Sequence, residues 1–128
     1  MRSDDSGIQT DPFAMDVHDG VLRIVWIRGT SVNDVDARAL VERSRALSAG
    51  VRLPMLVELN GMVTLTRNAL LQFAKELNLT AMALVGPSAV DKVIAAHFIE
   101  VHEPVYPTRY FPSRDEALTW LSSCSHAI

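Results

Sequence analysis

The chain has 128 residues, of which 48% are hydrophobic and 21% are charged, and its formal net charge is −3. This length suits one domain with its own apolar core and is too short for two ordinary domains. Lys and Arg form no stripe along the sequence, which argues against nucleic acid or an anionic membrane as partner, because both attract clustered positive charge.

The single cysteine, Cys124, cannot form an internal disulfide, which fits a reducing compartment. Residues 1–12 are polar and acidic, unlike a secretory leader, and no apolar run approaches the roughly 18 residues of a membrane span. We therefore expect a cytoplasmic protein with a flexible lead over residues 1–12, one domain over 13–122 and a short tail over 123–128.

A β-hairpin is predicted at the start of this domain. Phe13–Val17 alternates apolar and polar residues, Asp19-Gly20 is typical of a type I′ turn, and Val21–Ile27 forms the returning strand. The later elements follow in chain order: a helix from the capping box of Asn33 and Asp36 to Gly50, a strand over Leu53–Leu59, a helix capped by Thr66, a strand over Leu79–Val85, a helix from a capping box of Ser88 and Asp91, a strand over Tyr106–Phe111 and a helix capped by Ser113.

This β-β-α-β-α-β-α-β-α order predicts an α/β fold with a mixed, mostly parallel five-stranded sheet and helices packed on it. The first strand should pair antiparallel at an edge of the sheet. Leu79–Val85 is almost wholly apolar, as expected for a strand that helices cover on both faces.

The third helix carries the two histidines that could suggest a metal. We assign its inner face to six residues, namely Val90, Val93, Ile94, His97, Phe98 and Val101. His97 is then a hydrogen-bonded core residue and His102 points elsewhere, so the spacing does not favour a metal site.

In an open parallel sheet, ligands favour the crevice at the carboxyl ends of the strands. Asn60 and Ser88 lie at such ends, and the capped start of the second helix, with Thr66, faces the same edge. Free N–H groups of capped helices could bind an anion there, although such caps also simply satisfy their own helices.

No nucleophile motif, phosphate-binding loop or dinucleotide fingerprint occurs, so we expect neither an enzyme nor a cofactor. Glu58 is the one oddly placed acidic residue, within an apolar strand, and we interpret it as paired with an arginine or with strand-end amides. The last strand concentrates Tyr106, Arg109 and Tyr110, residue types that are enriched at interfaces, although packing under the last helix explains them equally well.

The stretch Leu59–Leu70, with sequence LNGMVTLTRNAL, resembles the signature of STAS domains, the fold of anti-sigma-factor antagonists. The opening hairpin, the helix spacing and the closing helix extend this resemblance over about residues 13 to 122, most closely to SpoIIAA-like domains of the STAS/SEC14 type. The resemblance implies a non-enzymatic switch in which a serine at the start of the second helix is phosphorylated by a partner kinase.

In this register Asn68 stands where that serine would be, and only Thr64 and Thr66 remain as acceptors nearby. The resemblance therefore implies a regulatory or protein-interaction domain without the usual phosphoserine switch, with Arg67 and Asn68 on the functional surface. Self-association as a homodimer is one form of that interaction. The alternative function is binding of an anion or apolar small molecule in the strand-end crevice.

Overall fold

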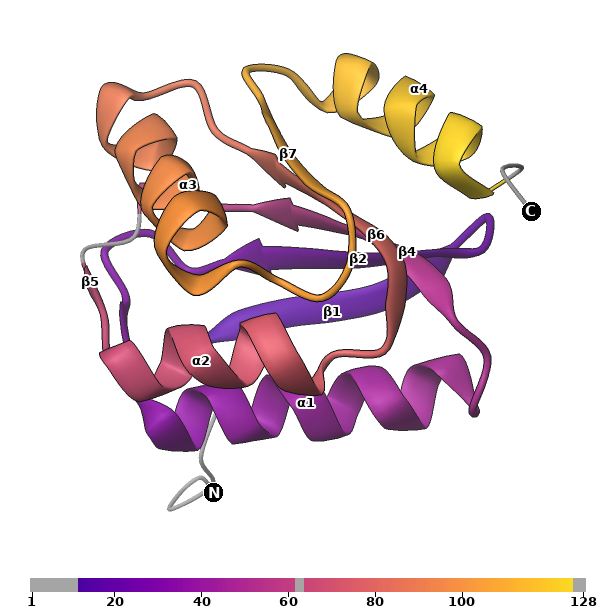
Figure 1. Ribbon diagram of the computed structural model, residues 1–128, viewed down its shortest axis with the longest axis horizontal. Helices are drawn as coiled ribbons and strands as arrows, with labels where there is room; N and C mark the ends of the chain where they lie inside the picture. Colours follow the sequence, from indigo (N-terminus) through magenta and orange to yellow (C-terminus); the bar gives the residue numbers. More distant parts are fainter. Residues whose placement is uncertain (1–11, 62–63, 126–128) are drawn as a thin grey trace, which may run out of the picture.

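A five-stranded mixed sheet forms the centre of the computed structural model, which describes residues 12–61 and 64–125 (Figure 1). The strand order is β1-β2-β4-β6-β7, with β1 antiparallel to β2 and all other neighbours parallel. The strands span Phe13–His18 (β1), Val21–Trp26 (β2), Leu53–Glu58 (β4), Leu79–Val85 (β6) and Thr108–Phe111 (β7). The predicted mixed, mostly parallel sheet is confirmed, and so is the antiparallel edge position of the first strand.

The hairpin turn has the backbone that its sequence demands. Asp19 and Gly20 both adopt positive φ angles, 52° and 76°, as the two central residues of a type I′ turn must. The turn fixes the register of β1 against β2 from His18↔Val21 to Phe13↔Trp26 without a break.

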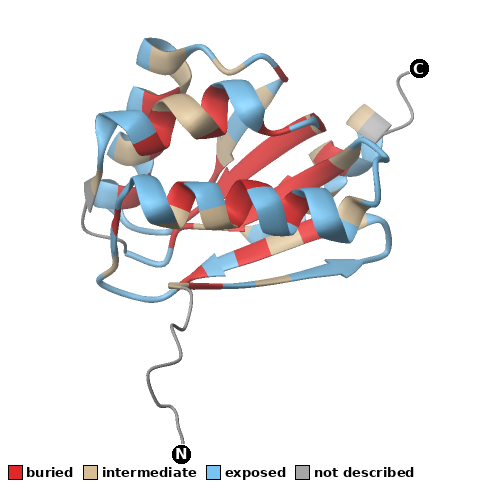
Figure 2. Ribbon diagram, turned by 90° about the horizontal axis from the view of Figure 1, so that it is seen from below, coloured by how far each residue is buried: buried red, intermediate tan, exposed pale blue. Residues whose placement is uncertain are grey.

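Helices cover the two faces of the sheet unequally (Figures 1 and 2). The helices α1 (Asp34–Ser48), α2 (Arg67–Glu76) and α3 (Ala89–His102) lie on one face, over the larger core cluster around Trp26. The other face carries only α4 (Arg114–Ser125), which packs on β4, β6 and β7. The far side of β1 and β2 therefore has no helix of the described chain over it. Within the same described chain, no helix combines the length and apolar character that a lipid bilayer crossing requires.

A second, two-stranded parallel sheet was not predicted. It pairs β3 (Ser31–Val32) with β5 (Thr64–Leu65), and the Thr66 N–H extends it by donating to the Val32 carbonyl at 2.9 Å. Each strand has only two residues, too few for hydrophobic periodicity to detect. The ribbon places the starts of α1 and α2 side by side.

The prediction for the inner face of α3 is right only for Phe98, which is buried, and for Ile94, which packs against the larger core. Val90, Val93 and Val101 are 56%, 67% and 60% exposed, and His97 is also exposed, whereas Asp91 and Ala95, which were not assigned to this face, are buried. The helix is apolar on most of its circumference, so periodicity alone cannot tell the buried side from the exposed one.

Two element ends also differ from the prediction. The last strand begins at Thr108 instead of Tyr106, and α4 continues to Ser125, so residues 123–125 of the expected tail are helical, while 126–128 lie outside the described residues. Residues 1–11 of the expected N-terminal lead lie outside the described residues, and Pro12 already accepts a hydrogen bond from the Ile27 N–H.

Tyr106 lies in the core and not on a surface where a partner could reach it. Its side chain is buried, and its hydroxyl donates to the Phe73 carbonyl at 2.6 Å, which joins the segment before β7 to α2. Burial raises the pKa of Tyr106 well above its usual value. The prediction that Tyr106 contributes to an interface is corrected accordingly.

Replacing Tyr106 with Phe should lower the free energy of unfolding by about 1 kcal/mol at pH 7, because the Phe73 carbonyl loses its buried partner. The raised pKa also makes stability depend on pH. The unfolded chain releases the Tyr106 proton near pH 10 and the folded chain does not, so this contribution is complete below about pH 10 and is lost as the pH rises further.

Urea unfolding at several pH values between 7 and 11 measures both effects. The Tyr106→Phe variant should lose less stability above about pH 10 than the parent chain, since it lacks this titration. Parallel curves for the two proteins across that range would contradict the assignment.

Candidate functional site

The start of α2 is capped as the sequence predicts. The Thr66 side chain accepts a hydrogen bond from the Ala69 N–H at 3.1 Å, in the extended conformation usual for a cap residue. Thr66, Arg67 and Asn68 therefore form the first turn of α2, and their side chains take different directions.

Asp34 binds two of these three side chains. It is the first residue of α1, and its carboxylate accepts from the Thr66 hydroxyl at 2.8 Å and from the Asn68 amide at 3.2 Å. The Gln72 amide donates to the Asp34 carbonyl at 3.3 Å. The sequence alone does not reveal the role of Asp34, because only the β3–β5 ribbon brings the two helix starts together.

Asn60 and Ser88 form contacts of their own at the carboxyl edge of the sheet. Asn60 has a positive φ of 53°, and its amide donates to the Trp26 carbonyl at 3.0 Å. Ser88 accepts from the Asp91 N–H at 3.1 Å and so caps α3. The predicted residues thus fall into two groups, with Asn60 and Ser88 apart from the α2 start.

The predicted capping box at α3 is only half present. The carboxylate of Asp91 is buried and accepts from the Gly61 N–H at 3.1 Å, across to the loop after β4. A Cβ at Gly86 would lie 2.4 Å from the Asp91 Cβ, so Gly86 leaves the space in which Asp91 reaches that loop. These contacts bridge the crevice in which a ligand was expected.

A groove of about 460 Å³ lies between α2 and α3. Arg67, the third predicted residue of the α2 start, lines this groove and not the Asp34 contact. Apolar and polar side chains share the lining: Leu65, Leu70, Leu71 and Val101 with Arg67, His97 and His102.

The two histidines of α3 are neighbours in the groove. Their ring centroids are 5.4 Å apart, which corrects the expectation that His102 points away from a buried His97. Burial, followed by the nearby His97 and Arg67 charges, lowers the pKa of His102. The described residues contain no group of three or more His, Cys, Asp or Glu side chains arranged to hold a metal ion.

Exposed valines continue the groove along α3. Val90, Val93 and Val101 are each more than half exposed and lie on one side of the helix together with His97. The residues of this stripe are three and four positions apart in the sequence, so the sequence indicates that they share one side of the helix. The same spacing fits a buried face equally well, so it does not show that the stripe is exposed.

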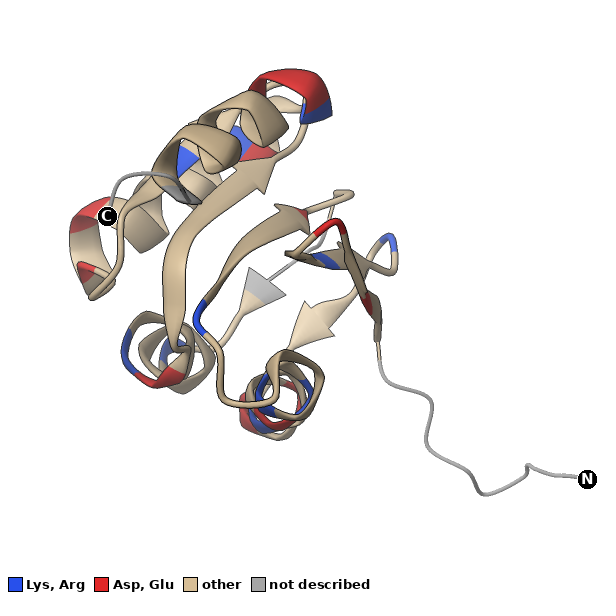
Figure 3. Cartoon of the chain, turned by 90° about the vertical axis from the view of Figure 1, so that its right-hand side faces the viewer, with Lys and Arg blue, Asp and Glu red and all other residues tan. Residues whose placement is uncertain are grey.

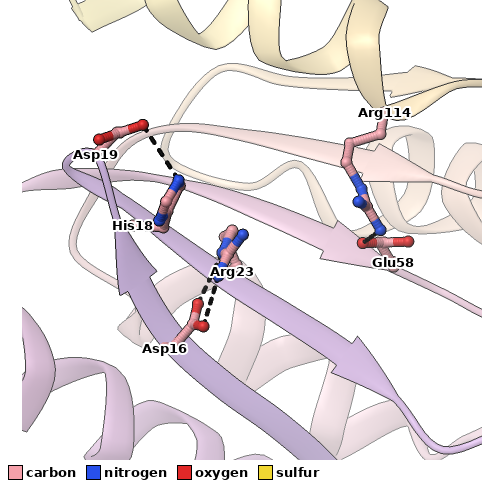
Figure 4. A network of polar contacts seen from close by, with 6 residues as sticks. All are labelled: Asp16, His18, Asp19, Arg23, Glu58 and Arg114. Carbon is pink, nitrogen blue, oxygen red and sulfur yellow. Dashed lines mark hydrogen bonds and ion pairs between the residues drawn. The ribbon is translucent and has the colours of Figure 1, made fainter.

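Charged pairs lie on the face of the sheet that carries α4, and one of them gives Glu58 of the apolar strand β4 an ionic partner (Figure 4). Arg114, in the first turn of α4, contacts the Glu58 carboxylate at 2.5 Å, which confirms the predicted pairing with an arginine. Asp16 and Arg23 form a two-bond pair across β1 and β2 at 2.8 and 2.6 Å, and these hydrogen bonds hold the pKa of Asp16 below its usual value.

The remaining predicted interface residues lie on the two faces of β7. The Arg109 guanidinium stacks 5.2 Å from the Phe111 ring centre and 5.7 Å from that of Trp120, on the α4 side. Tyr110 packs against the larger core and its hydroxyl donates to the Gly86 carbonyl. Tyr110 therefore contributes to internal packing, whereas Arg109 stays exposed and its place at an interface stays a prediction.

Two further features bear on ligands. An apolar cavity of about 40 Å³ lies between α2, α3 and the sheet, next to Phe73 and Phe98. Both basic and acidic side chains lie on α1 and α2, which are seen end-on in Figure 3. Neither helix therefore presents a face of a single charge.

Solved structures share this architecture and define the fold as SpoIIAA-like. An uncharacterised protein of the DUF3478 family with a SpoIIAA-like fold, from Shewanella loihica PV-4, is 15% identical with a TM-score of 0.61, over 90% of this chain and 99% of that one. An anti-sigma factor antagonist from Mycobacterium paratuberculosis is 19% identical with a TM-score of 0.55, over 86% and 92% of the two chains.

The chain belongs to the family described as "Domain of unknown function (DUF7793)", whose model it matches over residues 15–125. A protein with unknown function from Arthrobacter sp. FB24 is 34% identical over 85% of this chain and 98% of that one, with a TM-score of 0.35. No curated protein matches the sequence.

Removing the Asp34 side chain tests the contact between α1 and α2. The Asp34→Ala variant should unfold with a free energy about 1 kcal/mol lower, since the Thr66 hydroxyl and the Asn68 amide both lose their acceptor. Asn68→Ala should be costly in the parent chain and nearly neutral in the Asp34→Ala background.

Chemical denaturation of the four proteins in this cycle gives the coupling energy directly. Glu42→Ala, which removes an exposed carboxylate of the same helix, serves as control and should change stability by less than about 0.5 kcal/mol. Additive effects of the two substitutions would contradict the contact.

Proposed function

We propose that this chain is a non-enzymatic regulatory domain that binds another protein through the α2–α3 groove. The observation that carries the proposal is the composition of that groove, in which leucines and a valine lie beside Arg67, His97 and His102. Apolar side chains left exposed in a contiguous patch mark interaction surfaces, because water around them is released when a partner covers them.

The lining also indicates the chemistry of the partner. Leu71 and Val101 offer an apolar seat for a large side chain, while the Arg67 guanidinium favours a carboxylate nearby and the histidine rings offer N–H donors. An acidic segment with apolar anchors, such as an amphipathic helix, satisfies both requirements. The Arg67 charge would speed the encounter and set its orientation, while the apolar seat would supply most of the affinity.

The fold supports a role of this kind. One protein with the same SpoIIAA-like architecture is an anti-sigma factor antagonist, a name that describes action on another protein. The resemblance to STAS domains implies a functional surface at the start of the second helix, and the position of Arg67 at the border of the groove supports the proposal.

A phosphate at the start of α2 would not suit this chain. The Thr66 hydroxyl already bonds the Asp34 carboxylate, so a phosphate on that oxygen would face a negative group at close range. Asn68 has no hydroxyl to modify. Partner binding would therefore depend on the partner's concentration or on a change at another position.

The alternative of a small ligand at the carboxyl ends of the strands has less support. Asn60 and Asp91 bond backbone groups across that edge, so the polar atoms that would hold a ligand are already engaged. The apolar cavity lies elsewhere, beneath α2 and α3.

Substitutions in the groove should weaken partner binding. A partner captured by the full chain should bind the Val101→Asp variant at least about tenfold more weakly, since a buried charge would replace an apolar contact. Arg67→Glu should slow association, and the effect should shrink as salt is added. Surface plasmon resonance with the purified partner measures both rates.

Val35→Asp is the matched control, because Val35 is 74% exposed on α1, outside the groove lining. It should leave the affinity unchanged. Equal binding by Val101→Asp and the parent chain would overturn the proposed surface, whereas a small molecule retained by the chain in native mass spectrometry, with no protein partner, would favour the alternative.

A further inference from the structure

Within residues 12–61 and 64–125, no strand pairs with the outer edge of β1. The Ile27 N–H donates to the Pro12 carbonyl, and the unbroken register then assigns residues 14, 16 and 18 to hydrogen-bonded pairs with β2. The N–H and C=O groups of Phe13, Met15 and Val17 therefore point away from the sheet. Among the described residues, β2 is the only strand that pairs with β1.

The two edge strands of the sheet differ in how easily a further strand could pair with them. The edge strand β7 has only four residues and lies between Pro107 and Pro112, which limit its extension. The edge strand β1 has six residues, contains neither proline nor glycine and has no bulge. Figure 2 shows β1 beyond α1, at the margin of the molecule.

We propose that a second copy of this chain adds to the sheet along β1, antiparallel to the first, and makes a two-fold symmetric dimer with a continuous sheet through both copies. The two-fold axis passes beside Met15. This register pairs all of the outward residues, with Met15 opposite Met15 of the second copy and Phe13 opposite Val17.

The side chains agree with this register. Asp16 lies opposite Ala14 of the second copy, so no like charges meet, and each Asp16 keeps its own Arg23. An axis beside Asp16 instead would oppose two carboxylates. On the α1 side, Val17 is 39% exposed and would cover the edge of the second copy's Phe13 ring, so the contact buries apolar surface on both copies.

The sheet face that carries α4 is uncovered over β1 and β2, and this open part is compatible with the dimer. Val25 and Ile27 of β2 are 38% and 55% exposed, and no helix of the described chain lies over them. Joining two copies at β1 brings these two uncovered halves together into one surface. The dimer site is separate from the α2–α3 groove, so either can fail without the other.

Two substitutions at Ala14 test the register of the two β1 strands. Ala14 is exposed, and in the proposed dimer it lies opposite Asp16 of the second copy. Sedimentation equilibrium should show a monomer–dimer equilibrium for the parent chain below about 1 mM. By symmetry each substitution acts twice, so Ala14→Lys should tighten the dimer about tenfold through the two Asp16 carboxylates, and Ala14→Asp should weaken it about tenfold.

Val17→Pro tests the edge itself. It removes an outward N–H and leaves the β1–β2 hydrogen bonds in place, so the variant should be a folded monomer by sedimentation and circular dichroism. A parent chain that stays monomeric to about 1 mM overturns the proposal. A folded Val17→Pro variant that still dimerises also overturns the proposal. If Val17→Pro does not fold, the proposal is overturned by equal dimer dissociation constants for Ala14→Lys and Ala14→Asp.

Discussion

The burial of β4 and β6 between two helical layers is the constraint on which the rest of the structure depends. Both strands are almost entirely apolar, so both faces of the sheet centre must be covered. Three helices cover one face and a single helix covers part of the other. The unequal coverage leaves the outer side of β1 and β2 open, where charged pairs such as Asp16–Arg23 lie in water.

Several polar groups at the carboxyl ends of the strands find partners within the fold. Asp91 reaches the Gly61 N–H, Asn60 reaches the Trp26 carbonyl and Asp34 joins the starts of α1 and α2. Asp91 is buried, and a buried acceptor without a partner would cost about 1–3 kcal/mol, so its contact stabilises the loop after β4. The same contacts use the atoms that a ligand at this edge would need.

The two surfaces proposed for binding are surfaces that the core does not require. On α3, small residues such as Ala95 face the sheet and let the helix approach closely, while larger valines remain outside. The α2–α3 groove offers an apolar seat beside the Arg67 charge, and the β1 edge offers backbone hydrogen bonds. A regulatory domain with the SpoIIAA-like fold could use the first surface for a partner and the second for its own copy.

By itself the sequence determined the order of the elements, the hairpin turn at Asp19-Gly20, the helix caps and the arginine pairing of Glu58, because each depends on neighbours in the chain or on the cost of an unpaired charge. Only the tertiary structure decided which side of α3 is buried, that Tyr106 lies in the core and that Asp34 meets Thr66. Those outcomes depend on segments more than thirty residues apart, such as Phe73 and Tyr106, whose proximity no local pattern encodes.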